Sequence, residues 1–408
     1  MAYLGSRPAR TAVTSDQITD GVVTAAKLAT DSVTTVKIAA ANVTTAKITD
    51  ANVTAAKLAA SSALVGRNLI QNGEVSVSQR GTTTGHGTGG SYGPDRWKYE
   101  SSGSPSGRCT LSQGTGIVNA ASSLRVDVTT ADSALAAPAL YQVTQKIEAQ
   151  NLHFLEYGAA TAKTMTYSFT AKTNFSGSMT LYLIAADGPR SYATEIDLVG
   201  DESQETFAFV IPGDASGAFN FDTGVGLDVM FTLSSGSDFT GGTEDAWAAS
   251  ANNMYGASNS GNFFASTSTY IEFSLMQLEV GSVATDFEHE PISVTLAKCQ
   301  RYLLRLSTHS ANTFIANGSC NSTTVLRCSV PFPVEMRIGA TTGTVSAADG
   351  FSVNIPSSRI ASTAATAGAG RKTNGTLFIT VGSGLTSGQA GNAETATTDD
   401  YAQWSAEL

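Results

Sequence analysis

The chain has 408 residues, more than a single hydrophobic core usually accommodates, so about two globular domains are expected beside any fibrous segment. Only 14% of its residues are charged, and 24 Lys and Arg stand against 34 Asp and Glu, for a net charge of −10 at pH 7. This acidity excludes nucleic-acid binding through clustered basic residues. No apolar run approaches the ~18 residues of a membrane-spanning helix, and four cysteines are too sparse for a disulfide framework.

A repeat occupies residues 13–60. One large aliphatic residue stands at every fifth position, and two such steps make a ten-residue unit. A helix turns about 100° per residue and a strand alternates its two faces, so this spacing produces neither a helical stripe nor a one-sided strand. The aliphatic residues are Val13, Ile18, Val23, Leu28, Val33, Ile38, Val43, Ile48, Val53 and Leu58.

Three arrangements of the repeat remain: a shaft in which several chains wind around one another, a pentapeptide solenoid, and a disordered linker. A solenoid is disfavoured because stacked repeats need neighbours and caps, and this one would have only about two coils. The shaft is the preferred interpretation, and it makes the protein an obligate oligomer. Residues 61–66 are expected to be a linker of small residues.

From residue 67 onward the pattern predicts β structure. Short runs of alternating apolar and polar residues are separated by Gly, Asn and Ser, as in antiparallel sheets with one buried face. Strands at this density predict a β-sandwich of the jelly-roll type over residues 67–291. The clearest runs are Ser123–Val128, Thr164–Thr170, Met179–Ile184 and Thr206–Ile211.

Two segments have a helical pattern. Ala139–Leu155 is ambiguous, whereas Leu296–Arg305 follows Pro291 and is expected to join the sandwich to a second domain.

A smaller β domain is expected over residues 292–408. Its predicted strands include Thr323–Pro331, Val334–Ala340 and Thr376–Val381. Ser357–Gly370, rich in Ser, Thr, Ala and Gly, is expected to be a loop or a flexible insertion. The predicted fold class is therefore all-β, with a repetitive fibrous N-terminal segment.

Two stretches carry residues suited to a saccharide site, where flat aromatic faces and planar amide or acid groups are needed. The first is Ser91–Tyr99, in which Trp97 is expected in the core. The second is Asp238–Phe264, a long polar segment with the glycines of a functional loop. The candidate glycan-binding residues are Tyr92, Trp247, Asn252, Asn253 and Tyr255.

Other chemistry has weak support in the sequence. Asp286, Glu288 and Glu290 would share one face of a strand and offer oxygen ligands to a cation, but a solvated segment is the preferred interpretation. Glycan hydrolysis needs two carboxylates across the scissile bond, and neither Glu244–Asp245 nor Glu272 with Glu279 stands out among 34 acidic residues. No catalytic residue is assigned, and a non-enzymatic protein is expected.

Several motifs occur in a fixed order between residues 67 and 408. Together they resemble bacteriophage tail-fibre proteins with a jelly-roll domain like that of carbohydrate-binding modules, and the Val-Thr-x-Ala-Lys-Ile repeats resemble the segments that precede such domains. The motifs are Arg67–Gly81, Asp95–Trp97, Gln145–Glu148, Tyr157–Lys163, Tyr167–Phe169, Gln277–Thr285, Leu296–Tyr302, Pro331–Arg337 and Trp404–Leu408.

The resemblance implies a non-enzymatic homotrimer in the virion tail that is made in the host cytoplasm. Residues 1–20 would dock to other tail proteins, residues 13–60 would form the shaft, and the β domains would bind bacterial surface glycan. A structural head fibre or spacer and a glycan-degrading tailspike remain as alternatives. The residues assigned to virion attachment are Tyr3, Leu4, Arg7 and Pro8.

The resemblance also bears on metal binding. Asn72–Glu74 resembles the opening of sugar-binding jelly rolls, in which an early and a late strand can share a structural calcium ion. Glu74 and Glu279 are therefore the pair to test for Ca²⁺, with ordinary edge-strand residues as the alternative, and no other cofactor is expected. One departure is that Phe287–Pro291 is acidic, where relatives tend to have an aromatic residue and an Arg before the proline.

Overall fold

A computed structural model describes residues 18, 23–28, 33, 66–87, 89–307, 310–339 and 341–408. The chain divides into two compact units, residues 1–63 and residues 64–408. With 8% helix and 45% strand, the protein is all-β, as predicted. None of the helices in the described ranges is long and apolar enough to span a membrane.

The first unit contains the repeat. Its described part includes one 3₁₀ turn, Ala25–Lys27. Four repeat aliphatics are also described, and in the single chain each is 44–53% exposed. The choice between shaft and solenoid, and the attachment residues Tyr3, Leu4, Arg7 and Pro8, lie outside the described residues. The four exposed aliphatics are Ile18, Val23, Leu28 and Val33.

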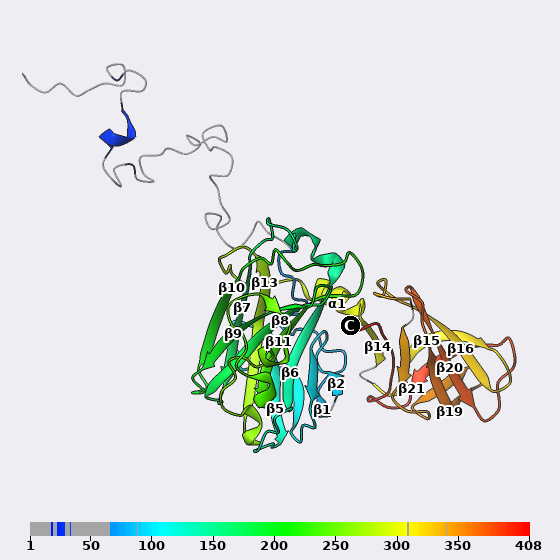
Figure 1. Cartoon of the computed structure of the whole chain (residues 1–408). Helices are drawn as coiled ribbons and strands as arrows, with labels where there is room; N and C mark the ends of the chain where they lie inside the picture. The colour runs from blue at the N-terminus through cyan, green and yellow to red at the C-terminus, as the bar shows by residue number, and fades with distance from the viewer. Residues whose placement is uncertain are drawn as a thin grey trace, which may run out of the picture. The chain divides into compact units, whose positions relative to one another are not determined.

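Residues 83–280 form two antiparallel sheets, which Figure 1 shows beside each other. In spatial order, the first sheet contains β1 (Thr83–His86), β4 (Arg108–Gly114), β5 (Ser123–Thr130), β13 (Tyr270–Val280), β7 (Met165–Thr173) and β10 (Gln204–Ile211). The second contains β12 (Ala248–Ala249), β9 (Arg190–Leu198), β8 (Gly177–Ala185), β11 (Val225–Ser235), β6 (Leu140–Glu148), β3 (Lys98–Ser102) and β2 (Gly89–Tyr92).

The core of this sandwich lies between the sheets. Phe231 of β11 and Phe273 of β13 stack with ring centroids 4.2 Å apart, which joins the second sheet to the first. Leu181 and Leu183 of β8 belong to the same buried cluster. Trp97 is fully buried in it, as predicted, and its indole nitrogen donates to the Asn72 carbonyl at 3.2 Å.

The second sheet is also covered in part on its other face. Tyr182 of β8 and Met230 of β11 are buried there against Met254. Met254 belongs to the segment 236–269, which connects β11 to β13 and places β12 on the edge strand β9. This connection therefore folds back over the second sheet and leaves a polar face between itself and β3.

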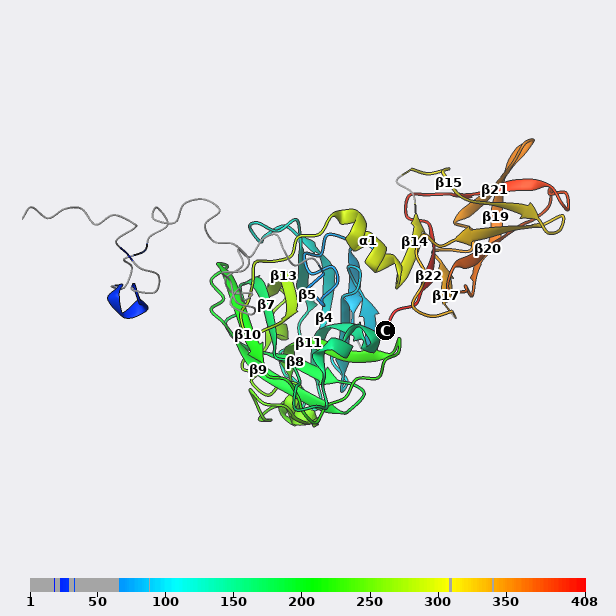
Figure 2. The same ribbon diagram turned by 90° about the horizontal axis from the view of Figure 1, so that it is seen from above.

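The chain then enters α1 (Ile292–Gln300), followed by a three-stranded sheet and a closed six-stranded barrel, most of whose strands are labelled in Figure 2. The sheet contains β14 (Leu303–Ser307), β22 (Tyr401–Ser405) and β17 (Thr342–Val345). The barrel contains β15 (Phe314–Cys320), β16 (Val325–Pro331), β20 (Asn374–Val381), β19 (Ser358–Gly368), β18 (Phe351–Ile355) and β21 (Ala390–Thr395).

Two helical predictions need correction. Ala139–Leu155 contains strand β6 and two short 3₁₀ turns. All residues of β6 except Lys146 are buried, so the strand lacks the alternation that identifies a half-exposed strand. Leu296–Arg305 covers only the second half of α1, because the chain has already entered β14 at Leu303.

Two predictions for the C-terminal part of the chain were also wrong. Val334–Ala340 is not a strand over its described residues, because its amides bond elsewhere: Met336 to the Lys372 carbonyl and Arg337 to the Arg301 carbonyl. Ser357–Gly370 was expected to be a loop, yet β19 within it pairs with both β18 and β20 in the barrel. Its small side chains resemble a low-complexity segment, although most of them simply form the exposed side of a barrel strand.

Candidate functional site

A cavity of about 480 Å³ lies where β2, β3 and β6 meet the 236–269 connection. We call this cavity the groove. Polar and apolar groups contribute about equally to its lining, which mixes amide and charged side chains with Leu140 and two aromatic rings. The side chains that matter most are Lys98, Glu100, Gln142, Phe239, Asn252 and Tyr255.

Strand alternation explains why polar side chains face the groove. On β3, Tyr99 enters the core, so Lys98 and Glu100 lie on the opposite face. On β6, Gln142 is likewise flanked by residues of the core. On β2, a Cβ added at Gly90 would lie 2.6 Å from Cε of Lys98, so the glycine makes room for the lysine side chain.

The aromatic part of the groove is held by stacked rings. Tyr255 lies 4.5 Å from the buried ring of Tyr182, measured between ring centroids. Phe239 meets Tyr255 edge-on at 6.0 Å. Tyr255 is half-buried and is positioned before any ligand arrives, which lowers the entropy lost on binding.

Charged groups run from the groove along the same sheet face. Nζ of Lys98 lies 2.5 Å from Oε1 of Glu100, and Nζ of Lys146 lies 3.1 Å from that oxygen. Lys146 also lies 3.8 Å from Asp228, which accepts a hydrogen bond from the Thr144 hydroxyl. Two ammonium groups thus balance two carboxylates.

These contacts displace the carboxyl pKa values in opposite directions. Burial acts to raise the pKa of Glu100, but the hydrogen bonds and charges of Lys98 and Lys146 outweigh it and lower that pKa. Burial raises the pKa of Asp228 to about 6, against the attraction of Lys146. At neutral pH both are ionised, and Asp228 takes up a proton in mildly acidic solution.

The structure brings together part of the predicted glycan-binding set. Asn252 and Tyr255 line the groove, and Asn253 is exposed beside Asn252. Trp247 is not in the lining. Its indole nitrogen donates to the Pro212 carbonyl at 2.7 Å, and its ring packs against other aromatic rings at the edge of the core.

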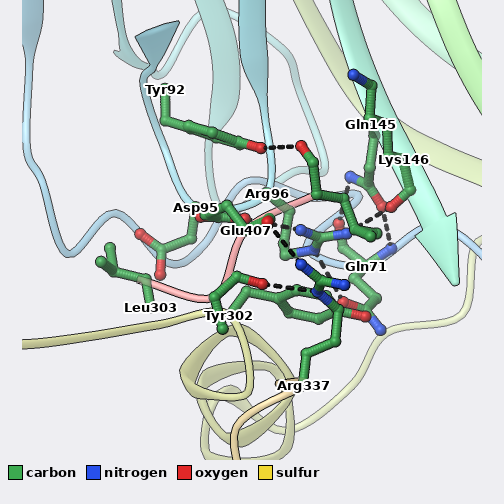
Figure 3. Close-up of polar contacts among 12 residues, drawn as sticks. Gln71, Tyr92, Asp95, Arg96, Gln145, Lys146, Tyr302, Leu303, Arg337 and Glu407 are labelled. Atoms are coloured by element: carbon green, nitrogen blue, oxygen red, sulfur yellow. Dashed lines mark hydrogen bonds and ion pairs between the residues drawn. The ribbon is translucent and has the colours of Figure 1, made fainter. Parts of the chain in front are cut away.

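Tyr92 is not in the groove lining either, although its ring centroid lies 5.6 Å from Nζ of the groove residue Lys98. Its hydroxyl donates to the Leu408 carbonyl at 2.6 Å, and Arg80 lies over its ring with 5.0 Å between the guanidinium carbon and the ring centroid. Figure 3 shows Tyr92 at the edge of a polar cluster between the sandwich and the later strands. We call this cluster the junction.

Arg96 is the centre of the junction and is only 2% exposed. Its guanidinium lies 2.8 Å from Glu407 and donates to Gln71 at 3.1 Å (Figure 3). The guanidinium carbon lies 3.5 Å from the centroid of the Tyr302 ring, and another nitrogen donates to the Lys146 carbonyl. Protein groups therefore balance the charge of Arg96, pack against its planar face and accept its hydrogen bonds.

A second ion pair closes the junction. Arg301 donates to both oxygens of the fully buried Glu148, at 2.7 and 2.8 Å, and the Tyr302 hydroxyl donates to the same carboxylate. Burial opposes ionisation of Glu148, but these donors lower its pKa. Arg337 donates to the carbonyls of Ala406, Glu407 and Thr223 at 2.7–2.8 Å.

Most motifs behind the family resemblance meet at this junction. Arg96 comes from Asp95–Trp97, Glu148 from Gln145–Glu148, Arg301 and Tyr302 from Leu296–Tyr302, and Glu407 from the last motif. The groove side chains come from other segments. Lys98 and Phe239 lie inside the two stretches singled out in the sequence, but neither they nor Glu100 and Gln142 were named as site residues. Alternation alone does not distinguish a groove face from a solvent-exposed face, and the segment of β6 had an ambiguous helical pattern.

Glu74 and Glu279 have different partners in the structure. Glu74 accepts a hydrogen bond from a backbone amide and lies 3.4 Å from His289. Glu279 is buried and accepts hydrogen bonds from Thr285, with Arg67 at 3.5 Å. Within the described residues, no three His, Cys, Asp or Glu side chains are grouped as metal ligands. Calcium binding by Glu74 and Glu279 stays a prediction.

The acidic segment 286–290 is not a strand, so its carboxylates do not share a strand face as expected. Glu288 accepts a hydrogen bond from the Asn68 amide at 2.9 Å, and Glu290 pairs with Lys298. These side chains hold the start of the sandwich and the start of α1.

No protein-family model and no curated protein sequence matches this chain. Among solved structures, the enzymatically active domain of tailspike protein 4 from bacteriophage CBA120 is similar over 53% of this chain and 22% of that one, with 10% identity and a TM-score of 0.29. A family 11 carbohydrate-binding module from Clostridium thermocellum, in complex with a mixed-linked tetrasaccharide, is similar over 50% and 100%, with 12% identity and a TM-score of 0.25. These values are too low to assign a family.

Proposed function

We propose that this protein is a bacteriophage tail fibre that binds saccharide on the host surface during adsorption, without cleaving it. The groove supplies the binding site. The observation that carries the proposal is the ring of Tyr255, held by two other rings beside Asn252, Gln142, Glu100 and Lys98 in a cavity of about 480 Å³. Aromatic faces with a few fixed polar groups are what saccharide binding requires.

The phage assignment rests on the order of the motifs and on the repeat. Residues 1–20, with Tyr3, Leu4, Arg7 and Pro8, would attach to other tail proteins, and residues 13–60 would form a shaft of three chains. The exposure of Ile18, Val23, Leu28 and Val33 in one chain supports packing against further chains. Three weak sites on one homotrimer would then act together on a repetitive cell surface. If analytical ultracentrifugation of the full chain finds only monomers, the proposal of a trimeric shaft is contradicted.

The binding test uses an array of purified bacterial surface polysaccharides and the full-length protein. Tyr255→Ala removes the ring at the centre of the groove and is expected to weaken binding about tenfold, because an aromatic contact is worth up to about 1.4 kcal/mol. Tyr255→Phe keeps the ring and is the matched control, expected to bind as the wild type does. Thermal melting checks that both variants fold.

The same experiment separates the alternatives. Wild-type protein that binds no polysaccharide on the array would contradict the adhesin proposal and favour a spacer or head fibre. Release of new reducing ends from a bound polysaccharide would show a tailspike. Equal binding by Tyr255→Ala and wild type would show that the groove is not the site.

A further inference from the structure

A row of polar side chains crosses four adjacent strands on the outside of the barrel. Asn317 of β15 pairs with Asn392 of β21, which pairs with Asn354 of β18, which pairs with Arg359 of β19. Directly paired residues project on the same side of a sheet. The neighbouring Ala393 is fully buried in the barrel core, so the row faces outward.

A second row beside it adds an aromatic ring and a carboxylate. Phe314 of β15 pairs with Glu394 of β21. Phe314 is 55% exposed, and its ring has no aromatic or cationic partner in the part of the chain that is described. Glu394 is only 2% exposed and accepts hydrogen bonds from Asn354 and Arg359, each at 2.6 Å. These bonds fix two members of the first row.

The two rows leave some polar groups available to a ligand. Asn317 is exposed and Asn392 half-buried, and neither side chain has a hydrogen bond within the described ranges. The charge of Arg359 is balanced by Glu394 at 2.6 Å, so the face carries no net charge. Three strand spacings of about 4.8 Å give the row a length of about 14 Å, which suits a short oligosaccharide.

We propose that this outer face of the barrel is a second saccharide site, specific for neutral sugar chains. Amide groups donate to and accept from hydroxyl groups, and the exposed ring of Phe314 offers a face for sugar C–H groups. An anionic polymer would need an excess of positive charge, and an apolar protein segment would need a larger apolar area than one phenylalanine supplies. The proposal stands on the barrel residues alone and does not require binding in the groove.

The test uses full-length protein and an array of neutral and acidic bacterial polysaccharides. The barrel variant is Asn317→Ala with Asn392→Ala, and Phe314→Ala is an independent second variant should the double variant fold poorly. Asn321→Ala, an exposed asparagine in the turn after β15, and Phe221→Ala, a phenylalanine 77% exposed on the sandwich, are the matched controls. Each barrel variant is also combined with Tyr255→Ala in the groove.

The expected result is that either barrel variant loses about tenfold in affinity for one or more neutral polysaccharides, while both controls bind as the wild type does. Tyr255→Ala alone should retain binding that the added barrel substitutions remove. If the barrel variants bind every polysaccharide with an affinity within twofold of the wild type, the proposal is overturned, irrespective of the result for Tyr255→Ala. If only the barrel variants lose binding, the second site stands and the groove proposal fails.

Discussion

The junction and the groove are two polar clusters on the same strand, β6, but they are filled in opposite ways. At the junction, Arg96 is 2% exposed and Glu148 is fully buried, and protein groups satisfy their donors and acceptors. In the groove, Lys98 and Glu100 keep 20% and 28% of their side-chain surface in water beside an open volume of about 480 Å³. Buried charges need a full set of protein partners, whereas half-exposed ones can exchange water for ligand hydroxyls.

The two clusters also differ in where their residues come from. Short motifs that are recognisable in the sequence supply most of the junction, whereas the groove takes Phe239, Asn252 and Tyr255 from one long connection. The motifs that carry the family resemblance therefore lie mainly at the contact between the sandwich and the later strands, and few of their residues lie in the groove. A loop that folds over a rigid sheet face can vary without disturbing the fold.

Arg96→Ala should have the largest effect on stability. It leaves Glu407 without its closest cation, removes the donor to the Gln71 side-chain oxygen and to the Lys146 carbonyl, and removes the cation over the Tyr302 ring (Figure 3). Removing one partner of a buried ion pair costs about 3–5 kcal/mol. Chemical denaturation monitored by tryptophan fluorescence measures this loss, and saccharide affinity of the folded variant should be unchanged.

The control for Arg96→Ala is Lys163→Ala. Lys163 pairs with Glu156 at 3.2 Å, and both side chains are 43% exposed, so its loss should stay within about 0.5 kcal/mol. Similar losses for the two variants would mean that burial does not distinguish the junction from surface ion pairs.

Much of the fold, but only part of the site, follows from the sequence. Runs such as Thr206–Ile211 alternate because one face is buried, and they are strands in the structure. Strand β6 was not predicted because both of its faces are buried, except at Lys146, so it lacks the alternation of a half-exposed strand. Glu100 pairs with Lys146 of β6 because of the register between β3 and β6. The two residues are more than forty positions apart in the sequence, and no local pattern predicts the register of such distant strands.

Asp228→Asn tests the cost of placing an acid beside the groove. Because burial raises the pKa of Asp228 to about 6, the folded state keeps a proton that the unfolded state has already released near pH 4. This aspartate therefore destabilises the fold progressively as pH rises from about 4 to 6. The displacement corresponds to about 3 kcal/mol above pH 6.

The variant should consequently be more stable than the wild type at pH 7 and about equally stable at pH 4. Denaturation curves at both pH values measure the difference. A gain at pH 4 as large as that at pH 7 would show that protonation of Asp228 is not the cause.

Among the substitutions in the two clusters, Lys98→Met should have the smallest effect on stability, and it tests directly whether the groove differs from the junction. Glu100 keeps its ion pair with Lys146 at 3.1 Å after the change, and both Lys98 and Glu100 reach water, so the loss should stay below about 1 kcal/mol. Binding to a polysaccharide that the wild type recognises should nevertheless weaken about fivefold, because a charge-assisted donor to sugar hydroxyls is gone. Thermal melting and the polysaccharide array give the two readouts. If Lys98→Met instead costs as much stability as Arg96→Ala, the groove charges hold the fold together as the junction charges do, and the assignment of the groove to recognition is wrong.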